Sequence, residues 1–396
     1  LTGTKIFISA GEHDLAENIV HLVLARLPDA PAGTKGISMF LVPKFKVDSS
    51  GALTERNQMS CGSIEHKMGI KASSTCVMNF DSATGWLIGP LNRGLNCMFV
   101  MMNTARLEVG IQGQGLIEAS FQNALPYALD RLQMRSLSGP KRPDLPADPI
   151  IVHPDVRRML LTQKAIAEAG RAQCLFSAHL VDEQRHANDP AQRQYADELL
   201  SFLTPITKGF LTEMAIECTS HGMQVLGGHG YIQEWGLEQL SRDARITTIY
   251  EGTTQIQALD LLGRKIVQTQ GVGFKHFLGL IGALVAEHQD NAAANEFLTP
   301  LARVADEWTQ LTIALGKRAM KDPDEIGAAA VDYLFYAGYA VHAYWWARMA
   351  VLALASPKVE FHQAKIHTAR FYFERLLPRT QAHRQSLEAG AGSLLG

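Results

Sequence analysis

The segment His221–Gln257 contains the side chain of this sequence that is best placed for proton transfer, the carboxylate of Glu251. Ile249 and Tyr250 precede it and Gly252 follows it. Apolar neighbours can remove water from a carboxylate, and a glycine lets a ligand approach the backbone closely. Such a carboxylate can act as a general base. A glutamate at a turn before a helix is more often a cap or a solvated residue, so Glu251 alone does not decide between these interpretations.

Two further motifs accompany this carboxylate. The glycine-rich run Gln224–Tyr231, QVLGGHGY, lies upstream of it. Its backbone N–H groups can bind an anionic or planar ligand, although such glycines also end helices. The pair Arg242–Asp243 follows, and then the run Tyr250–Gln257, YEGTTQIQ. The three motifs in this order are far more specific than any one of them.

These motifs resemble the C-terminal signature of the acyl-CoA dehydrogenase family, which has the form QxLGGxGY, then RDA, then IYEGTxQIQ. The resemblance implies FAD as cofactor and an acyl-CoA thioester as substrate. It makes Glu251 the base that removes the α-proton while the β-hydrogen leaves as hydride to flavin N5, with Tyr250 and Gly252 as substrate contacts. An α C–H is a poor acid, so the base must be well placed and dry. The thioester oxygen also needs donors, one of which would be the backbone N–H of Glu251.

The resemblance assigns two N-terminal residues to the flavin. The run Lys5–Gly11, KIFISAG, is similar to the family strand KxWITNG, on which an aromatic lies beside the isoalloxazine and a hydroxyl bonds near N5. Phe7 and Ser9 take these places, so the aromatic and the hydroxyl are preserved although the residue types differ. Taken alone, Phe7 would be expected in a core.

Other residues match the family's contacts to the FAD diphosphate. Arg131 and Gln133 lie in YALDRLQM, where the family's arginine reaches the FAD of a neighbouring subunit, and a guanidinium suits phosphate because it binds bidentately. The remaining expected FAD contacts are Gln224, Gly227 and Gly228 for that same site, and Thr253 and Gln255 for the FAD near Glu251. A site built across chains requires a homodimer or homotetramer.

Arg106 matches the arginine that lies near the substrate channel in the family. Most arginines on helices instead form an ion pair on the helix surface, and Arg106 could do the same. Some relatives carry the base just before this arginine, but here that position is Ala105, so Glu251 has no rival there.

Composition limits the class of protein. The chain has 396 residues, of which 46% are hydrophobic and 19% charged, which is enough for two or three domains. A net charge of −2 argues against a nucleic-acid binding surface. The five cysteines have no CxxC spacing and suit reduced thiols in a cytoplasmic protein, and we expect no metal site. The chain opens on LTGTKIFIS, as if already within a domain, so we expect that its N-terminal part is missing.

The expected fold is α+β and mostly α. Residues 1–90 are expected to form a partial β-sandwich or barrel domain, with strands at 6–9, 19–25, 37–42 and 76–80. Residues 91–270 are expected to form an antiparallel four-helix bundle that holds FAD and the catalytic residues. The expected bundle helices are 94–135, a second from Pro154, 191–220 and 237–268, with an exposed proline-rich loop at 136–150.

Residues 271–396 are expected to form an additional helical domain. Its expected helices are 277–287, 297–320, 324–355 and 361–389. Such an extension resembles the larger acyl-CoA dehydrogenases, including the 3-methylmercaptopropionyl-CoA dehydrogenases.

The resemblance therefore predicts α,β-dehydrogenation of an acyl-CoA, with electrons passing to an electron-transferring flavoprotein. Three alternatives remain open. An acyl-CoA oxidase differs only in whether oxygen reaches the reduced flavin. A DNA-binding flavoprotein relative would carry a basic C-terminal surface, whereas residues 271–396 have scattered charges of both signs. A fragment that keeps the fold could also have lost activity.

Overall fold

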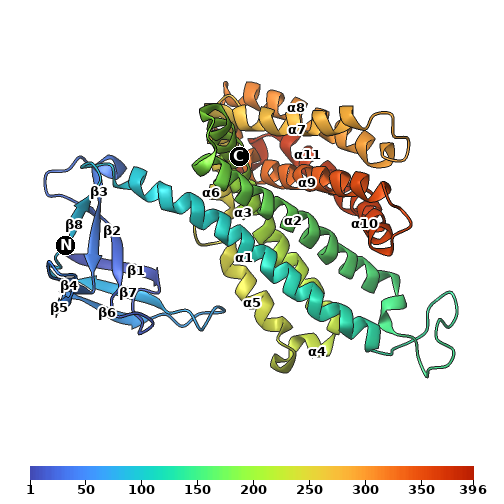
Figure 1. Ribbon diagram of the computed structural model, residues 1–396, viewed down its shortest axis with the longest axis horizontal. Helices are drawn as coiled ribbons and strands as arrows, with labels where there is room; N and C mark the ends of the chain where they lie inside the picture. Colours follow the sequence, from blue (N-terminus) through green and yellow to red (C-terminus); the bar gives the residue numbers. More distant parts are fainter. The chain divides into compact units, whose positions relative to one another are not determined.

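The computed structural model describes residues 1–396, which form two compact units, Leu1–Ala105 and Arg106–Gly396. The expected class is confirmed, because small antiparallel sheets are followed by a long series of helices (Figure 1).

The first unit contains three small antiparallel sheets. In one, β7 (Thr75–Phe80) lies between β1 (Gly3–Ser9) and β6 (Met59–Ile64). In the second, β3 (Ile37–Pro43) lies between β2 (Val20–Arg26) and β8 (Trp86–Ile88), and the third pairs β4 (Phe45–Val47) with β5 (Leu53–Arg56). A short 3-10 helix, η1 (Gly33–Gly36), precedes β3. The four expected strands are confirmed.

The core of the first unit explains why these strands were recognisable. It contains inward-pointing residues of the strands, namely Val23, Val42, Met59, Cys76, Met78 and Phe80. The strands that the sequence did not indicate are β4, β5, β6 and β8. Two of them are three residues long and the other two are largely exposed, so they lack an apolar pattern long enough to detect.

The helical bundle of the second unit is antiparallel, as expected. It consists of α1 (Gly94–Asp130, which begins in the first unit), α2 (Pro154–His186), α3 (Pro190–Leu226) and α5 (Leu237–Thr247). Proline at the first position of α2 and the Asp189 cap of α3 set two helix starts. The Gln114 side chain of α1 donates to Ala167 O of α2 at 2.8 Å, and Gln173 of α2 donates to Thr207 of α3 at 2.8 Å.

Glycines let α1 approach α3 closely. A Cβ on Gly110 would come within 2.9 Å of Thr207, and one on Gly113 within 3.1 Å of the Leu211 carbonyl. The run GIQGQG therefore serves helix packing and not a dinucleotide turn.

Two predicted helices, 237–268 and 361–389, are interrupted. The segment 237–268 is not continuous, because α5 ends at Thr247 and α6 (Thr254–Leu259) begins after a turn; the π-helix η4 (Asp260–Gln268) then follows. Left-handed backbone at Glu251, with φ 53°, and at Gly252, with φ 92°, cannot continue a right-handed helix. Between α3 and α5 lie the short α4 (Gly228–Tyr231) and η3 (Gln233–Trp235).

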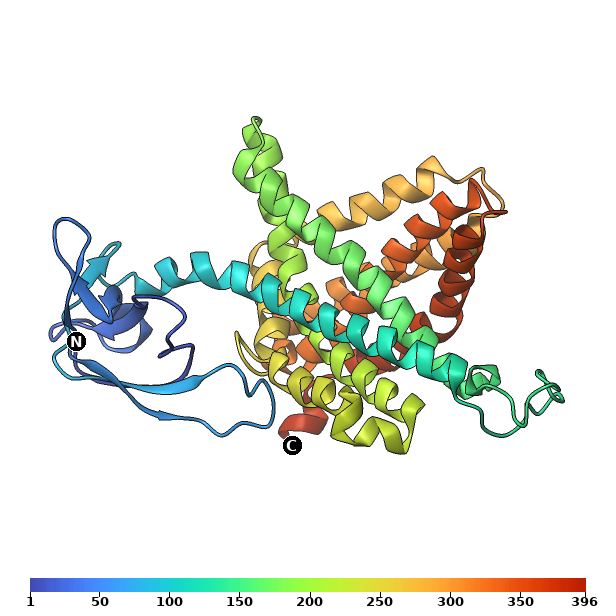
Figure 2. The same ribbon diagram turned by 60° about the horizontal axis from the view of Figure 1, so that its bottom comes forward.

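The C-terminal helices pack around one long buried helix, α9 (Asp324–Leu354). It contacts α8 (Asn295–Ala319), α10 (Glu360–Phe371) and α11 (Thr380–Ala389), while α7 (Val272–Glu287) packs on α8 (Figure 2). The predicted helix 361–389 is interrupted by η5 (Tyr372–Leu376) and η6 (Leu377–Arg379), where Pro378 removes a backbone donor. The chain ends with α12 (Gly392–Leu395).

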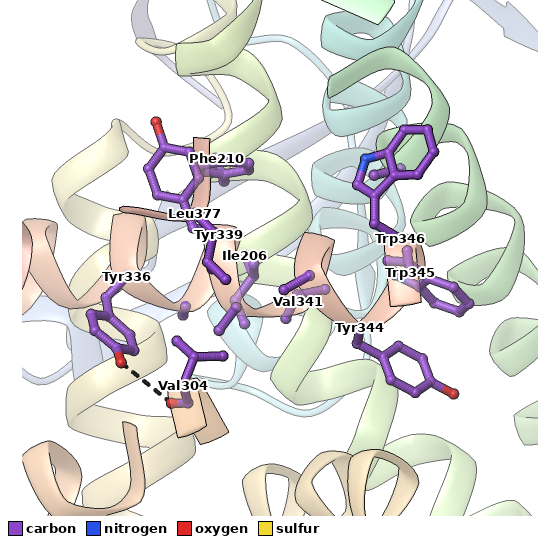
Figure 3. Close-up of a cluster of buried hydrophobic side chains, with 14 of the residues drawn as sticks. Ile206, Phe210, Val304, Tyr336, Tyr339, Val341, Tyr344, Trp345, Trp346 and Leu377 are labelled. Carbon is purple, nitrogen blue, oxygen red and sulfur yellow. Dashed lines mark hydrogen bonds between the residues drawn. The ribbon is translucent and has the colours of Figure 1, made fainter. Parts of the chain in front are cut away.

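Aromatic side chains of α9 join these helices to the bundle. Figure 3 shows Tyr339 and Tyr336 of α9 near Phe210 of α3 and Val304 of α8. The Trp346 indole donates to Ala165 O of α2 at 3.0 Å. Bundle and C-terminal helices thus share one core, and the predicted boundary near residue 270 remains a proposal.

Candidate active site

Glu251 lies on the turn between α5 and α6, with its side chain half-buried. Its carboxylate makes no hydrogen bond or ion pair, and its φ of 53° belongs to the left-handed region that most residues avoid. The cap of α6 is Thr253, whose side chain accepts from Ile256 N at 3.3 Å. Glu251 is therefore neither a helix cap nor a fully solvated side chain.

Two buried side chains hold the backbone of this turn. Lys208 of α3 donates from Nζ to Gly252 O at 2.6 Å. Gln257 of α6 donates from Nε2 to Glu251 O at 3.1 Å and to Gly252 O at 3.3 Å. Both side chains are at 0% exposure, so water does not compete for these bonds.

The neighbours of Glu251 are also anchored, from two other helices. The hydroxyl of Tyr250 donates to Gln112 Oε1 of α1, and burial raises the pKa of this hydroxyl. The hydroxyl of Thr254 donates to Glu213 Oε1 of α3. Ile249 was expected to exclude water from the Glu251 carboxylate, but its side chain is 46% exposed. The turn is thus tied to α1 and α3 by its polar side chains more than by its apolar ones.

Arg106 is buried and ion-paired, which differs from the surface pair considered for it. It is 4% exposed and donates from Nη1 to Asp260 Oδ2 at 3.0 Å. Asp260 also accepts from Arg264 at 3.3 Å. The Nε of Arg106 is buried without a partner, so one donor of the guanidinium is left for another group. Its predicted contact with substrate remains a proposal.

The glycine-rich turn lies at the other end of α5, which is about 16 Å long at 1.5 Å per residue. A Cβ on Gly227 or Gly228 would meet no atom within 4 Å, and Gly227 has φ 59°. Gln224 is exposed beside them. The backbone of this turn is therefore open to a ligand.

The end of α1 lies close to the same turn. The Tyr127 hydroxyl and His229 Nδ1 are 2.8 Å apart, and the rings of Tyr127 and Trp235 pack edge to face at 5.3 Å. Arg131 follows Tyr127 by one helical turn, and its exposed guanidinium makes no hydrogen bond or ion pair. Gln133 is exposed as well. The structure thus brings Arg131 and the glycine turn to one end of the bundle.

Phe7 and Ser9 lie on β1, in the first unit. The strand is irregular between Lys5 and Ile8, and Phe7 has φ 57°. The Phe7 side chain is 68% exposed, so its interpretation as a core residue is wrong. Ser9 is exposed on the same strand.

Sequence reasoning missed Lys208, Gln257 and Gln112, which support the turn, and Asp260, which pairs with Arg106. A signal existed for Lys208, since it is the only charged residue within the apolar run 202–211. A lysine is seldom fully buried without a specific partner. The two amides and Asp260 carried no comparable signal.

No group of three His, Cys, Asp or Glu side chains is arranged to hold a metal ion. None of the helices combines the length and apolar character needed to cross a membrane.

The chain is similar to known proteins along its whole length. Residues 92–266 match the family model for the acyl-CoA dehydrogenase C-terminal domain, and residues 277–396 match the model described as acetyl-CoA dehydrogenase C-terminal like. The 3-methylmercaptopropionyl-CoA dehydrogenase of Ruegeria pomeroyi is 43% identical over 401 residues, covering 100% of this chain and 67% of that protein.

Two solved structures have the same fold. The Caenorhabditis elegans protein ACDH-11 in complex with C11-CoA has a TM-score of 0.78 at 21% identity, covering 100% of this chain and 63% of that one. The acyl-CoA dehydrogenase of Bacillus anthracis complexed with FAD has a TM-score of 0.77 at 18% identity, covering 98% and 64%. The chain spans about two thirds of the curated relative and less than two thirds of these two.

Proposed function

The chain belongs to the acyl-CoA dehydrogenase family, and from this premise we propose that it performs the FAD-dependent α,β-dehydrogenation of an acyl-CoA thioester, with Glu251 as the base. The observation that carries the proposal is the state of the Glu251 carboxylate. It is half-buried, has no partner, and stands on a turn whose carbonyls are tied to Lys208 and Gln257. Such a carboxylate is free to accept a proton from a fixed position.

Glu251 accepts the α-proton, and the electrons of that C–H bond form the α–β double bond as the β-hydrogen leaves with its electron pair. FAD, when bound, supplies the acceptor for this hydride. Gly252 is a proposed substrate contact through its backbone, since Gln257 already fills the place of a Cβ there, and the backbone N–H of Glu251 is the proposed donor to the thioester oxygen. Arg106 and Tyr250 complete the proposed substrate side, Arg106 through its unpartnered Nε.

The residues present fit the cofactor. The unpaired Arg131 guanidinium suits a diphosphate, and the open backbone of Gly227 and Gly228 suits an anionic or planar group. Phe7 presents an exposed aromatic ring, with the Ser9 hydroxyl on the same strand. The other proposed FAD contacts, all exposed, are Gln133, Gln224, Thr253 and Gln255.

A homodimer or homotetramer is part of the proposal. Thr253 and Gln255 lie at one end of α5, whereas Arg131 and the glycine turn lie at the other, about 16 Å away along that helix. Two separate FAD-binding surfaces on one chain favour a site completed by a second copy. The proposed electron acceptor is an electron-transferring flavoprotein, and the proposed location is the cytoplasm.

The test is a visible spectrum of the full-length protein with a panel of acyl-CoA thioesters. We expect bleaching of the flavin absorbance with the wild type and none with Glu251→Gln, which should keep its FAD. Glu287→Gln, which changes an exposed glutamate of α7, is the matched control and should bleach like the wild type. Bleaching by Glu251→Gln at the wild-type rate would refute the assignment.

The oxidase alternative is decided in the same experiment. After substrate reduction, a dehydrogenase should be reoxidised by an electron-transferring flavoprotein and only slowly by air. Rapid reoxidation by oxygen with formation of hydrogen peroxide would identify an acyl-CoA oxidase.

A further inference from the structure

A buried cation lies directly behind the turn that carries Glu251. The Lys208 side chain is at 0% exposure, and its one hydrogen bond is the bond of 2.6 Å to Gly252 O. Desolvating an ammonium group is costly unless its surroundings compensate. A lysine in this place is therefore poorly explained as packing, since an apolar residue of similar length would fill the space more cheaply.

The charges around Lys208 come from three elements. Glu213 lies five residues further along α3, Arg106 lies on α1, and Glu251 lies on the turn itself. Burial lowers the pKa of Lys208 to about 8, with Arg106 acting in the same direction and Glu213 and Glu251 acting against it. Lys208 is thus predominantly charged at neutral pH.

The second support of the turn does not replace Lys208. Gln257 binds the two carbonyls at 3.1 and 3.3 Å, which are longer contacts, and it belongs to α6, the helix that follows the turn. Lys208 belongs to α3 and is the only side chain that ties Gly252 to the core of the bundle. Without Lys208, the carbonyls of the two adjoining left-handed residues would be held only by Gln257, from the helix that follows them.

We propose that Lys208 is a positioning residue for the base: its ammonium group binds the Gly252 carbonyl and thereby fixes the turn that aims the Glu251 carboxylate at the thioester. This role rests on the proposed function. Lys208 acts through the backbone and does not touch the substrate. Its loss should therefore slow proton removal while leaving the binding of the thioester and of FAD largely unchanged.

The experiment isolates proton removal from oxidation. The thioester 3,3-dimethylbutanoyl-CoA has α-hydrogens but no β-hydrogen, so it cannot be oxidised to an enoyl-CoA. In deuterated water the base removes an α-proton and a deuteron returns to the same carbon, which mass spectrometry detects. The full-length wild type should exchange this proton and Glu251→Gln should not.

Three variants are compared with the wild type. Lys208→Met removes the donor and the charge at similar length, whereas Lys208→Gln keeps a donor without the charge. Lys265→Met is the matched control, because Lys265 also donates one bond, to Ser201 at 2.7 Å, but supports no part of the turn. Hydrogen–deuterium exchange of the peptide 250–257 reports on the turn independently of any reaction.

Lys208→Met should lower the α-proton exchange rate roughly 100-fold, the cost of a misplaced reacting group, with little change in thioester affinity or FAD content. The amides of 250–257 should lose protection, and Lys208→Gln should recover part of it. Wild-type exchange in Lys208→Met, or equal loss of thioester affinity and rate, would overturn the proposal. If the wild type exchanges no proton, the proposed function fails; unchanged protection in Lys208→Met would then also overturn its hold on the turn.

Discussion

Arg379 binds the Glu217 carboxylate with both terminal nitrogens of its guanidinium. Nη1 and Nη2 lie 2.9 and 2.8 Å from the two carboxylate oxygens, and Nη1 also donates to the Tyr339 hydroxyl at 3.1 Å. Glu217 lies on α3 and Arg379 on η6, so the pair ties the last helices to the bundle. His221 Nε2 lies 3.4 Å from the same carboxylate.

This ion pair should make stability depend on pH. Burial raises the pKa of Glu217, but hydrogen bonds from His221 and Arg379 outweigh it and lower the pKa from 4.5 to about 2. The unfolded chain therefore binds the proton first, so the contribution of Glu217 is complete above pH 4.5 and is lost as the pH falls towards 2. We expect the midpoint of urea unfolding to fall over this window in the wild type, and less so in Glu217→Gln.

The exposed pair of Arg370 and Glu296 provides a control, since it is also bidentate, with hydrogen bonds of 2.6 and 3.0 Å. Glu217→Gln should cost about 1–2 kcal/mol of unfolding free energy at pH 7, between the values for exposed and buried pairs. Glu296→Gln should change it by under about 1 kcal/mol. Equal effects of the two substitutions would show that burial of the Glu217 pair is unimportant.

Gly252→Ala should distort the turn that carries the base. Gly252 has φ 92°, and a Cβ there would come within 2.6 Å of Gln257 Nε2. We expect a loss of about 1–3 kcal/mol in unfolding free energy together with a large loss of activity. Gly139→Ala, at φ 89° with no atom within 4 Å, should show the backbone strain without loss of activity. Full activity of Gly252→Ala would contradict the need for a fixed turn.

Gly338→Ala should overpack the contact between α9 and α3. A Cβ on Gly338 would lie 2.2 Å from the Phe210 ring, which is itself buried. Overpacking of this kind costs about 1–3 kcal/mol, measured by chemical denaturation. Gly327→Ala on the same helix meets no atom within 4 Å and should be neutral or stabilising, because alanine favours a helix. A neutral Gly338→Ala would mean that Phe210 can move aside.

Arg131→Met should weaken FAD binding without destabilising the fold. The Arg131 guanidinium is exposed and unpaired, so its removal breaks no contact within the chain. Loss of a charge-assisted bond to a phosphate should raise the Kd for FAD about 10–100-fold, measured by reconstitution of the FAD-free protein. Arg185→Met, at an exposed arginine near the end of α2, should leave the Kd unchanged. An unchanged Kd for Arg131→Met would remove it from the cofactor site.

The elements with a long regular period were predictable from the sequence. Pro154 marked the start of α2, and four predicted strands match β1, β2, β3 and β7. The helix predicted over 237–268 ran through the turn that the motif around Glu251 suggested, because apolar residues continue at helical spacing through η4. Periodicity records which face is buried and is insensitive to a short left-handed interruption.

The site residues that belong to sequence motifs were predictable. The residues that hold the backbone of the site in place were not. Glu251, Arg131 and the glycine turn stood out by residue type and order. Lys208 acts from α3 on a backbone carbonyl of a distant segment, and no local pattern encodes that long-range pairing. Gln257 is close in sequence to the carbonyls it binds, but a glutamine in a helix does not announce this role. Phe7 points outward because β1 is irregular at this position. An apolar residue type in the sequence gives no sign of that irregularity.

Lys208 and Gln257 both bind backbone carbonyls of the turn that carries Glu251 and so hold this turn in one conformation. A base held in one position should meet a bound methylene group from one side. Its two hydrogens, which are interchangeable in free solution, become distinguishable, and a stereospecifically deuterated thioester should keep or lose its label according to configuration. The left-handed backbone of Glu251 and Gly252 would in this way determine which of the two α-hydrogens is removed.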